Sequence, residues 1–533
     1  MSRRIQAAEL IGMNVVFRVD ASIEIGTGHV MRCLTLADGL RQRGIVCRFV
    51  CREHAGNLID AIAGRGFTVH AIPVVGAKGY EDEEPALDHK RWLGGDWRSD
   101  AAMTLESIGA IEVDWLVVDH YSLDARWERC LRSSCKAILV IDDLADRAHA
   151  CDVLLDQNHG RRPADYAERV TDDCKILVGP RFALLRPDFS ELRAKSLERR
   201  KNSQLRRLLI SLGGVDKDNA TGAVLEALRS CRLSNDVRLT VVLGSHSPYL
   251  AQVRAMTVEM PWATELLVDV RDMAALMADC DLAIGAAGIA AWERCCLGLP
   301  SLIVLLAANQ KPGARALETS GAAIILGDIS MIAAELPRAL QSLGSTACLV
   351  EISDAAEALC DGRGASRVVA LLDSWSNELL FVREVEPSDD DLLFRWANDP
   401  QTRLNAFNSD VIEWDSHQQW LSRKLLDREG CVFLIGCLPD GVPCGQVRFD
   451  RELNGDWMID YSVAPEFRGL GLGSRLLAAT IDVLIHRIPA ATLVGMVKPF
   501  NKPSIKVFES LGFRTGPVMV DGLHVFSRSS MDA

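Results

Sequence analysis

The sequence lacks an apolar stretch of the kind that crosses a membrane. Its 533 residues contain no run of about 18 consecutive apolar residues. The first residues are basic, but neither a long apolar core nor a small-residue cleavage site follows them, so we expect no secretory signal. These absences predict a cytoplasmic protein without a membrane partner.

An excess of positive charge is also missing. The chain has 59 lysine and arginine residues against 72 acidic ones, which gives a formal net charge of −13. General nucleic-acid binding needs a basic face and is therefore excluded. Anionic ligands must be held locally, by helix N-termini and single basic side chains.

Paired cysteine motifs are absent too. The 16 cysteines include no Cys-x-x-Cys pair. Adjacent Cys295 and Cys296 fall in a predicted helix, where both thiols are interpreted as small core residues. Unpaired cysteines scattered along the chain fit a reducing cytoplasm.

Short apolar segments that alternate with helical patterns fill the first third of the chain. A chain of this length exceeds one hydrophobic core, and about three to four domains are expected. Apolar strands separated by helices indicate a parallel sheet covered on both faces. The connection 76–109, rich in charge and tryptophan, is predicted to be a functional loop with some helix of its own. The predicted strands are 15–19, 45–50, 67–72, 115–119, 138–142 and 153–155.

The same alternation restarts after a polar stretch at 193–204, which we interpret as a domain boundary. Two similar halves predict twin Rossmann-like domains, 13–180 and 205–375, that face a cleft. Ligands in such folds sit at the carboxyl ends of the strands. The strands predicted in the second half are 208–212, 239–243, 266–268, 282–285, 301–306 and 323–326.

The pattern changes in the last third of the chain. Segments 432–435 and 445–449, joined by the turn 439–441, are typical of an antiparallel hairpin. A final pair of strands turns at 521–522. We therefore predict a mixed α+β domain over 379–530 and an α/β protein as a whole.

A glycine-rich turn in this last domain follows a predicted strand and opens an amphipathic helix. Backbone N–H groups at such a turn are free and lie at the positive end of the helix dipole, which predicts a pyrophosphate site. The turn reads Phe467-Arg468-Gly469-Leu470-Gly471-Leu472-Gly473-Ser474.

The loop after the first predicted strand carries the main catalytic candidate. Gly26 and Gly28 permit close backbone approach to a ligand and place His29 at the start of a helix. The helix N-terminus disfavours a positive charge, so this imidazole suits a general base. The alternative is an ordinary helix residue whose ring is hydrogen-bonded.

A second small-residue turn, 284–288, ends a strand of the second half and begins a helix. Gly285 and Gly288 would cradle a phosphate, and Glu293, one turn into the helix, can accept two ribose hydroxyl groups. No Walker lysine follows, which disfavours an NTPase. The alternative is a turn that serves helix–sheet packing alone.

Several ordered motifs in the first 370 residues together resemble the UDP-sugar hydrolases of bacterial pseudaminic acid synthesis. The resemblance implies the two-domain GT-B fold of glycosyltransferases, with water as the acceptor. It implies UDP-2,4-diacetamido-2,4,6-trideoxy-β-L-altropyranose as the substrate. The motifs are Val16-Phe-Arg-Val-Asp-Ala, Ile25-Gly-Thr-Gly-His-Val-Met-Arg32, Val118-Asp-His-Tyr121, Leu212-Gly-Gly-Val-Asp216, Trp292-Glu-Arg-Cys-Cys-Leu-Gly-Leu-Pro300 and Asn309-Gln310.

The resemblance also implies roles for residues of the first half. His29 would activate water against the anomeric carbon, and Asp20 and Tyr121 would line the sugar side of the cleft. A structural tyrosine at a strand end is the alternative for Tyr121. The neighbouring acids Asp142 and Asp143 are interpreted as helix caps.

In the second half, the resemblance assigns Glu293 to the ribose and the turn from Gly285 to Gly288 to the diphosphate. Asn309 and Gln310 would lie near the sugar. UDP would leave with inversion at the anomeric carbon. No metal is expected if the helix dipole and the glycine-rich turns neutralise the departing diphosphate.

The turn at 467–474 resembles the coenzyme A loop of GNAT acetyltransferases. A second signature of that family follows as Asn501-Lys-Pro-Ser504-Ile-Lys-Val-Phe-Glu-Ser-Leu-Gly-Phe513, and the resemblance spans about residues 380–530. It implies acetyl-CoA as co-substrate, with the pantetheine arm added as a strand beside a splayed strand pair. The residues that it assigns to acetyl-CoA are Val463, Arg468, Gly469, Leu470, Gly471, Leu472, Gly473, Ser474, Asn501 and Ser504.

One position departs from the GNAT pattern. Many members carry a tyrosine as general acid where this chain has Phe508, which cannot donate a proton. Asp460 and Glu466 are candidate bases acting through water, or else solvated charges. The sequence leaves the acid and the base of this domain unassigned.

The two resemblances predict a bifunctional UDP-sugar enzyme of pseudaminic acid biosynthesis. The C-terminal domain would acetylate the 4-amino group of a UDP-amino sugar, and the N-terminal region would hydrolyse the product. Alternatives are a glycosyltransferase, the same pair of activities on another UDP-diamino sugar, or a UDP-sugar-binding protein with an inactive GNAT half. Sugar stereochemistry, oligomeric state and channelling stay open.

Overall fold

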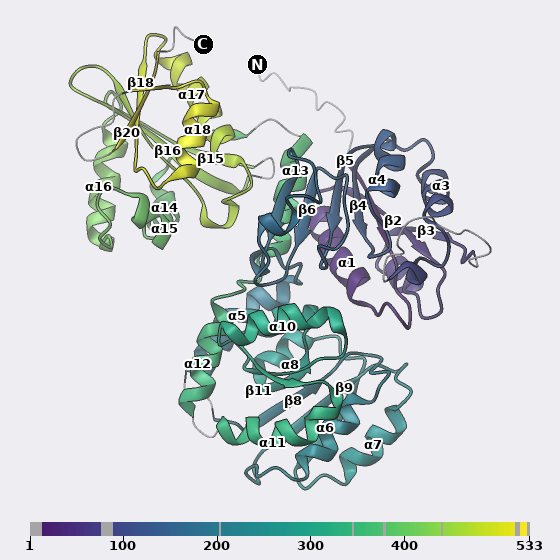
Figure 1. Cartoon of the computed structure of the whole chain (residues 1–533). Coiled ribbons are helices and arrows are strands. Elements are labelled where there is room, and N and C mark those ends of the chain that lie inside the picture. Colours follow the sequence, from purple (N-terminus) through teal and green to yellow (C-terminus); the bar gives the residue numbers. More distant parts are fainter. Residues whose placement is uncertain are drawn as a thin grey trace, which may run out of the picture. The chain divides into compact units, whose positions relative to one another are not determined.

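The computed structural model describes residues 13–75, 89–201, 204–343, 346–376, 380–438, 441–516 and 523–529. The chain divides into two compact units, Met1–Val368 and Val369–Ala533, and each is described by itself (Figure 1). None of the described helices is long and apolar enough to cross a membrane.

The first half of unit 1 is a seven-stranded parallel sheet in the order β3-β2-β1-β4-β5-β6-β7. Six strands were predicted from apolar runs, and β7 was missed because it is a short edge strand with a single buried residue. The strands are β1 (Asn14–Val19), β2 (Val46–Arg52), β3 (Thr68–Ile72), β4 (Val113–Asp119), β5 (Cys135–Ile141), β6 (Val153–Asp156) and β7 (Lys175–Val178). The helices of this first half are α1 (Gly28–Arg41), α2 (Ile59–Gly64), α3 (Trp97–Ile108) and α4 (Ala125–Leu131). Helix α3 lies in the connection predicted to contain helix, of which 76–88 is outside the described residues.

The second half of unit 1 is a six-stranded parallel sheet in the order β10-β9-β8-β11-β12-β13. Its strands are β8 (Arg207–Ser211), β9 (Arg238–Leu243), β10 (Ala263–Val268), β11 (Leu282–Ala286), β12 (Ser301–Val304) and β13 (Ile324–Gly327). Its helices are α6 (Ala220–Leu228), α7 (Leu250–Val258), α8 (Met273–Asp279), α9 (Ile289–Cys296), α10 (Lys311–Thr319), α11 (Ile332–Ser342) and α12 (Thr346–Glu357). Helix α13 (Gly364–Ser376) spans the division between the two units.

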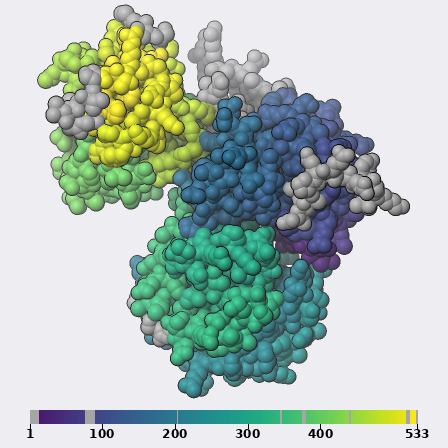
Figure 2. All heavy atoms as spheres, viewed as in Figure 1, coloured from purple at the N-terminus to yellow at the C-terminus, as the bar shows by residue number. Residues whose placement is uncertain are grey.

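Both faces of this second sheet are buried. Leu208 and Ile210 of β8 belong to one apolar core, whereas Leu209 between them belongs to the other. Successive side chains of a strand point to opposite faces, so each strand must be apolar throughout. In the space-filling view, the atoms of this half are those coloured teal to green, and they hide its strands from sight (Figure 2).

Helix α5 (Pro187–Arg200) occupies most of the polar stretch that we interpreted as a boundary. Arg200 is buried and donates three hydrogen bonds to carbonyl oxygens of the second half, those of Met277, Cys280 and Leu297. The basic residues therefore belong to a helix that packs on the second half. Residues 193–200 of the stretch are helical and are not a free linker.

Unit 2 contains a mixed sheet in the order β14-β15-β16-β17-β18-β20-β19, as the α+β pattern predicted. The predicted hairpin is formed by β15 and β16, while 439–440 and 521–522 of the two predicted turns lie outside the described residues. The strands are β14 (Phe381–Glu384), β15 (Cys431–Cys437), β16 (Pro443–Arg451), β17 (Trp457–Val463), β18 (Thr492–Val497), β19 (Arg514–Thr515) and β20 (His524–Ser529). The helices are α14 (Asp390–Ala397), α15 (Pro400–Asn405), α16 (Trp414–Leu426), α17 (Leu472–Arg487) and α18 (Lys502–Ser510).

Strands β17 and β18 form the one parallel pair among the described strands of this sheet, and they separate part-way along. They pair from Trp457 opposite Leu493 to Ile459 opposite Gly495, and then diverge. Residues 460–463 of β17 are paired with β16 on one side and with no described strand on the other. The predicted splay is therefore present, and it leaves an opening beside β17.

Candidate active sites

The first candidate site lies where the strand order of the first sheet reverses, between β1 and β4. Val19 and Asp119 are register partners at the carboxyl ends of these two strands. Loops that leave neighbouring strands in opposite directions at such a point form a crevice, which is the usual ligand site of doubly wound sheets. The loop after β1 and the segment after β4 carry the predicted residues.

His29 begins helix α1 and forms a short hydrogen bond across this crevice. Its Nδ1 lies 2.6 Å from Oδ1 of Asp119, and its side chain is 11% exposed. A carboxylate accepts only, so the hydrogen-bond network places the imidazole proton on Nδ1. No hydrogen bond to Nε2 is found among the described residues, and this nitrogen keeps its lone pair for a proton. The loop before it turns tightly at Gly26, which has a φ of +81°.

Asp119 is a fully buried carboxylate that is held ionised. Burial opposes its ionisation, but Arg32 and then His29 outweigh that effect and hold the pKa of the Asp119 carboxyl well below its usual range. Arg32 donates from Nε to Oδ2 and from Nη2 to Oδ1, both at 2.6 Å. The carboxylate therefore fixes the imidazole orientation and would stabilise an imidazolium once His29 has taken a proton.

Tyr121 packs edge-on against His29, with ring centroids 4.6 Å apart. Its hydroxyl donates to Oδ2 of Asp143 at 2.6 Å, and Nη1 of Arg32 donates to the same oxygen at 2.6 Å. Burial, followed by the charge of Asp143, raises the pKa of Tyr121, so the phenol stays protonated. Nδ2 of Asn158 donates to the other Asp143 oxygen at 3.0 Å.

The two neighbouring acids after β5 have different environments, and neither caps a described helix. Asp142 accepts backbone N–H groups of Leu144 and Ala145 and caps a turn. Asp143 points into the network of Tyr121 instead. The helix-cap interpretation is therefore wrong for both acids: Asp142 caps a turn that no described helix follows, and the Asp143 carboxylate is held by Arg32.

Asp20 is fully buried and lies beneath the crevice. Arg18 donates to both of its oxygens, at 2.7 and 2.9 Å, and the backbone N–H of Arg52 donates at 2.7 Å. Nε2 of His120 lies 3.3 Å from its Oδ2. The carboxylate offers no exposed surface, so in this structure it supports the loop and does not line the sugar side of the cleft.

Three of the residues that build this site were not singled out from the sequence: Asp119, Arg32 and Asn158. Asp119 carried a usable signal, because it ends an apolar strand that neighbours β1. Arg32 lies one turn after His29 on α1, which is the spacing of residues on one helix face. No sequence signal indicated Asn158.

The second candidate site lies at the corresponding reversal of the second sheet, between β8 and β11. Gly213 and Gly214 follow β8, and Gly288 precedes α9; a Cβ added at any of these three would meet no atom within 4 Å. A Cβ at Gly285 would instead lie 2.5 Å from Nη1 of Arg294. Gly285 thus serves packing, whereas the other three glycines border open space that a ligand could enter.

Arg294 lies beneath this turn as a buried cation. It is 1% exposed, donates from Nη2 to the Ala286 carbonyl at 2.7 Å and from Nε to Ser301 Oγ at 2.9 Å. No carboxylate of the described residues lies within salt-bridge distance of it. Burial lowers its pKa, and the neighbouring Glu293 charge offsets only part of that effect. The turn therefore combines a helix N-terminus with a buried positive charge.

Glu293 is a half-buried carboxyl group on the same helix. Burial raises the pKa of Glu293 to about 7, against the opposing charges of Arg186 and Arg294. Asn309 is exposed in the loop after β12, and Gln310 accepts the Leu306 backbone N–H at 3.1 Å. These three residues lie in unit 1 at the end of the sheet where the crevice opens.

The glycine-rich turn of unit 2 has the backbone conformation that a pyrophosphate site requires. Gly469 and Gly471 have φ values of +80° and +75°, and a Cβ at either would meet no atom within 4 Å. Gly471 is the N-cap of α17, so the first N–H groups of this helix have no partner within it. Leu470 and Leu472 are buried and anchor the turn.

Arg468 differs from its predicted role, because its side chain is used within unit 2. Nη1 donates to Asp399 at 2.5 Å, Nη2 to Thr402 Oγ at 2.7 Å, and Nε to the Val463 carbonyl at 3.1 Å. Arg468 thus ties the turn to the start of α15 and to the end of β17. Ser474 points back to the turn, with Oγ 3.4 Å from the Gly471 carbonyl.

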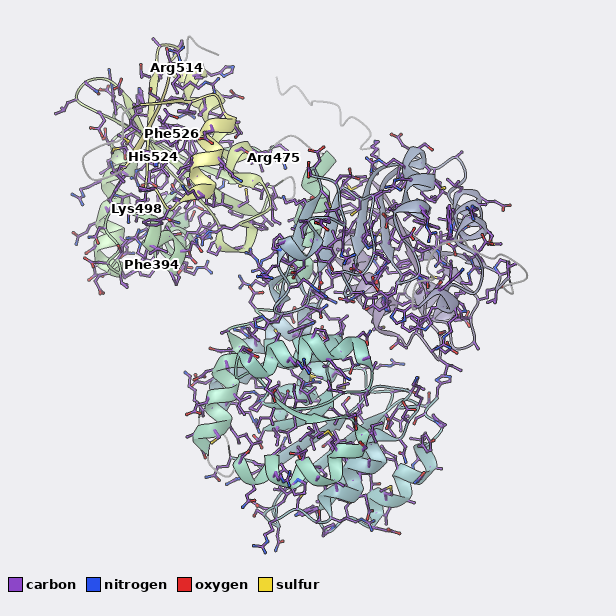
Figure 3. All side chains as sticks on the ribbon, in the orientation of Figure 1. Phe394, Arg475, Lys498, Arg514, His524 and Phe526 are labelled. Atoms are coloured by element: carbon purple, nitrogen blue, oxygen red, sulfur yellow. The ribbon has the colours of Figure 1, made fainter. Side chains whose placement is uncertain are left out.

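Helix α18 closes the far side of the opening beside β17. Asn501 caps it by accepting the Ser504 N–H at 3.4 Å. Phe508 is buried against Phe526 and Phe513, with centroids 5.1 and 4.9 Å away; Figure 3 labels Phe526 on β20 and Arg475 on α17. Asp460, one of the candidate bases, is paired with Arg448 at 2.9 Å.

No cluster of three or more metal-binding side chains is found in the described part of the chain. The side chains and helix ends that these sites do bring together are a histidine base, helix N-termini and a buried arginine charge.

Comparisons with known proteins find similarity both for a large part of the chain and for the domain in unit 2. A family model described as an acetyltransferase (GNAT) domain matches residues 380–514. Over 265 residues the chain is 24% identical to the UDP-2,4-diacetamido-2,4,6-trideoxy-β-L-altropyranose hydrolase of Campylobacter jejuni, covering 50% of this chain and 81% of that protein. The chain is a fusion of a hydrolase-like region and a GNAT acetyltransferase domain.

Other similar proteins cover larger parts of the chain. The spore coat polysaccharide biosynthesis protein SpsG of Bacillus subtilis is 25% identical over 68% of this chain and 98% of its own length. An uncharacterized protein of Methanocaldococcus jannaschii, MJ1062, is 22% identical over 94% of this chain and 97% of its own. The crystal structure of Acinetobacter baumannii MurG covers 68% of the fusion and 99% of that chain, at 16% identity and a TM-score of 0.51, which supports the GT-B-like fold.

Proposed function

We propose that the fusion carries out two successive reactions on a UDP-sugar. Unit 2 transfers an acetyl group from acetyl-CoA to the 4-amino group of a UDP-amino sugar. Unit 1 then hydrolyses the resulting UDP-2,4-diacetamido-2,4,6-trideoxy-β-L-altropyranose to UDP and the free sugar, as in pseudaminic acid biosynthesis. Similarity to the Campylobacter hydrolase and the GNAT family match support this proposal.

The observation that carries the hydrolase half is the His29–Asp119 pair at the reversal of the first sheet. Nε2 of His29 removes a proton from a water molecule, and the water oxygen bonds to the anomeric carbon. The bond from that carbon to the UDP oxygen breaks, with inversion, because one displacement reverses the centre. Asp119 stabilises the imidazolium, and Tyr121 holds the ring edge-on.

The second sheet receives the leaving diphosphate. Gly288 and the N-terminus of α9 accept the negative charge that develops on UDP, and Arg294 adds positive charge from below. Glu293 accepts the ribose hydroxyls, while Asn309 and Gln310 contact the sugar. Asp20 acts as a positioning residue beneath the crevice, because its oxygens are occupied by Arg18 and Arg52.

In unit 2, the pyrophosphate of acetyl-CoA binds the amides at the start of α17, and the pantetheine arm enters the opening beside β17. Over 460–463 no strand in the described part of the chain pairs with this edge of β17, as strand addition requires. The amine of the sugar attacks the thioester carbonyl directly, and coenzyme A leaves as a thiol.

The test is mass spectrometry of the purified protein with acetyl-CoA and UDP-4-amino-4,6-dideoxy-N-acetyl-β-L-altrosamine. We expect free UDP and the diacetamido sugar, both dependent on acetyl-CoA. With His29→Gln, the doubly acetylated UDP-sugar should accumulate, and Asp119→Asn should slow UDP release about 10²- to 10⁴-fold. UDP release at the normal rate by His29→Gln would overturn the base assignment.

A different UDP-diamino sugar, or a sugar acceptor in place of water, is the second candidate. The match to SpsG, a protein of spore coat polysaccharide synthesis, favours it because that match covers more of the chain than the hydrolase does. Acetylation followed by accumulation of the UDP-sugar in the wild-type protein would select this candidate. Absence of acetylation and of coenzyme A binding would leave a binding protein with an inactive unit 2.

A further inference from the structure

Acetyl transfer leaves a thiolate that must gain a proton, and Phe508 cannot supply it. The source of that proton matters only if unit 2 has the proposed acetyltransferase activity, on which the following assignment rests. The chain has five tyrosines, at positions 80, 121, 166, 249 and 461, so Tyr461 is the single tyrosine of unit 2. We propose that Tyr461, supported by Ser504, is the general acid that protonates the departing thiolate.

The position of Tyr461 in the sheet carries the argument. It is the second residue after Ile459, at which pairing between β17 and β18 ends, so it stands at the closed end of the opening. Its hydroxyl donates to Oγ of Ser504, in the first turn of α18, at 3.0 Å. The phenol thus bridges β17 and α18 at the place where the two strands part.

The neighbours of the ring define the rest of the opening. A Cβ added at Gly473, near the start of α17, would lie 3.9 Å from Cε2 of Tyr461. The ring centroids of Tyr461 and Phe508 are 6.0 Å apart. The Phe508 ring lies directly on Gly495 of β18, because a Cβ added there would be 2.3 Å from its Cζ. An arm that starts from a diphosphate on α17 and enters the opening must pass the phenol before it reaches Phe508.

The chemical environment suits an acid. The Tyr461 side chain is largely enclosed, and burial raises its pKa, so the hydroxyl is protonated at neutral pH. The Ser504 hydroxyl acts in the opposite direction, because it can turn and donate to a phenolate. The pair therefore holds a proton before the reaction and stabilises the oxygen after the proton has left.

In the proposed step, each bond that forms is matched by one that breaks. The sugar amine bonds to the carbonyl carbon of acetyl-CoA and loses one proton to water. The carbon–sulfur bond breaks, its electron pair stays on sulfur, and the Tyr461 hydroxyl proton moves to that sulfur. The phenolate regains a proton from solvent through the Ser504 hydroxyl.

The first experiment compares Tyr461→Phe with the wild-type full-length chain. We expect kcat for thiol release to fall about a hundredfold, the usual contribution of a general acid, while the Kd of coenzyme A measured by calorimetry changes less than about threefold. The falling alkaline limb of the wild-type pH–kcat profile, where the phenol ionises, should disappear. Unchanged kcat, or parallel loss of kcat and of coenzyme A affinity, overturns the assignment.

The second experiment moves the hydroxyl to the neighbouring ring. The double variant Tyr461→Phe/Phe508→Tyr should regain at least about tenfold in kcat over Tyr461→Phe, because a phenol again faces the opening. A purely structural tyrosine would gain nothing from this exchange. Ser504→Ala keeps the phenol and removes its hydrogen-bond partner, so it should lower kcat less than Tyr461→Phe does. A larger loss in Ser504→Ala would contradict the proposal that Tyr461 is the acid and Ser504 its support.

Failure of the Tyr461 assignment can be distinguished from failure of the proposed UDP-amino sugar substrate. If the wild-type protein binds coenzyme A but acetylates no UDP-amino sugar, the proposed substrate is wrong. Thiol release from acetyl-CoA with a simple amine such as spermidine or a hexosamine then provides the rate. The general-acid assignment fails if that rate is insensitive to Tyr461→Phe.

Discussion

Glu293 is the residue of the second site whose charge changes near neutral pH. Its pKa is raised to about 7 by burial, so the free protein contains both the carboxyl and the carboxylate form at that pH. A carboxylate accepts two ribose hydroxyls, whereas the protonated group must give up one acceptor. Ligand binding should therefore favour the ionised form.

We expect the affinity for UDP to rise about tenfold between pH 6 and pH 8, as Glu293 ionises. Calorimetry across this range measures the change. Glu293→Gln is the matched control, because it retains the titration of the UDP phosphate itself and removes that of the side chain. An identical pH dependence in both proteins would contradict the role of Glu293.

At the same scale, the sequence predicted single residues better than it predicted their partners. His29 could be found because two glycines and a helix start surround it in the chain. Asp119 is 90 positions away, and its carboxylate meets the imidazole only because β4 lies beside β1. Asp20 was misplaced for the same reason: sequence cannot show that Arg18 and Arg52 turn it inward.

At the scale of elements, the strands of the first sheet are held at their carboxyl ends by a buried charge cluster. Asp100 on α3 accepts from Arg18 at 2.6 Å, Arg52 at 2.6 Å and Trp127 at 3.0 Å. It joins one helix to β1, β2 and α4. Removing one partner of such a cluster leaves uncompensated charge in the interior.

We predict that Asp100→Ala lowers the free energy of unfolding of unit 1 by about 3–5 kcal/mol, because Arg52 loses its carboxylate partner and Arg18 keeps only Asp20. Denaturant unfolding followed by circular dichroism measures it. Asp38→Ala, which breaks the surface pairs to Arg41 and Arg65, should cost about 0–1 kcal/mol. Equal effects of the two substitutions would refute the cluster's role.

The turn before α17 offers a second test at this scale. Gly471→Glu places a negative charge where we expect a pyrophosphate and should abolish coenzyme A binding measured by calorimetry. Gly455→Glu is its control, since Gly455 also has a positive φ and open space but lies in the turn between β16 and β17. Loss of binding in both variants would indicate strain and not charge repulsion.

Apolar runs predicted most strands, because a parallel sheet with two buried faces needs continuous apolar residues. They failed at β7, an edge strand, and at α5, whose arginines resemble a linker until their carbonyl partners are known. Helices α14 to α16 were not predicted. Their bounds depend on packing within unit 2, where Lys498, labelled in Figure 3, donates to the carbonyls of Leu404 and Ala406 at the C-terminal end of α15.

At the scale of the whole molecule, the two candidate sites of unit 1 and the glycine-rich turn of unit 2 belong to separate compact units. The proposed reactions need no residue from the other unit, so each should survive the loss of its neighbour's activity. The division into a GT-B-like region and a GNAT domain was predictable, because each carries several motifs in a fixed order.

We therefore predict that two inactive proteins complement each other. A mixture of His29→Gln and Gly471→Glu should release UDP from the amino sugar and acetyl-CoA, because the acetylated intermediate diffuses from one protein to the other. The rate should rise with the concentration of the His29→Gln protein and approach that of the wild type. Mass spectrometry of the mixture measures it, and no UDP from the mixture would mean that the sites depend on one another.

The opening beside β17 also affects how the protein behaves without ligand. A strand with unpaired backbone groups is a template for strands of other molecules, and such edges promote aggregation. Asp460 lies on this edge with its side chain 53% exposed, and a charge there hinders the approach of another strand. Coenzyme A would cover the same backbone, so keeping it in the buffer should extend the shelf life of the purified protein.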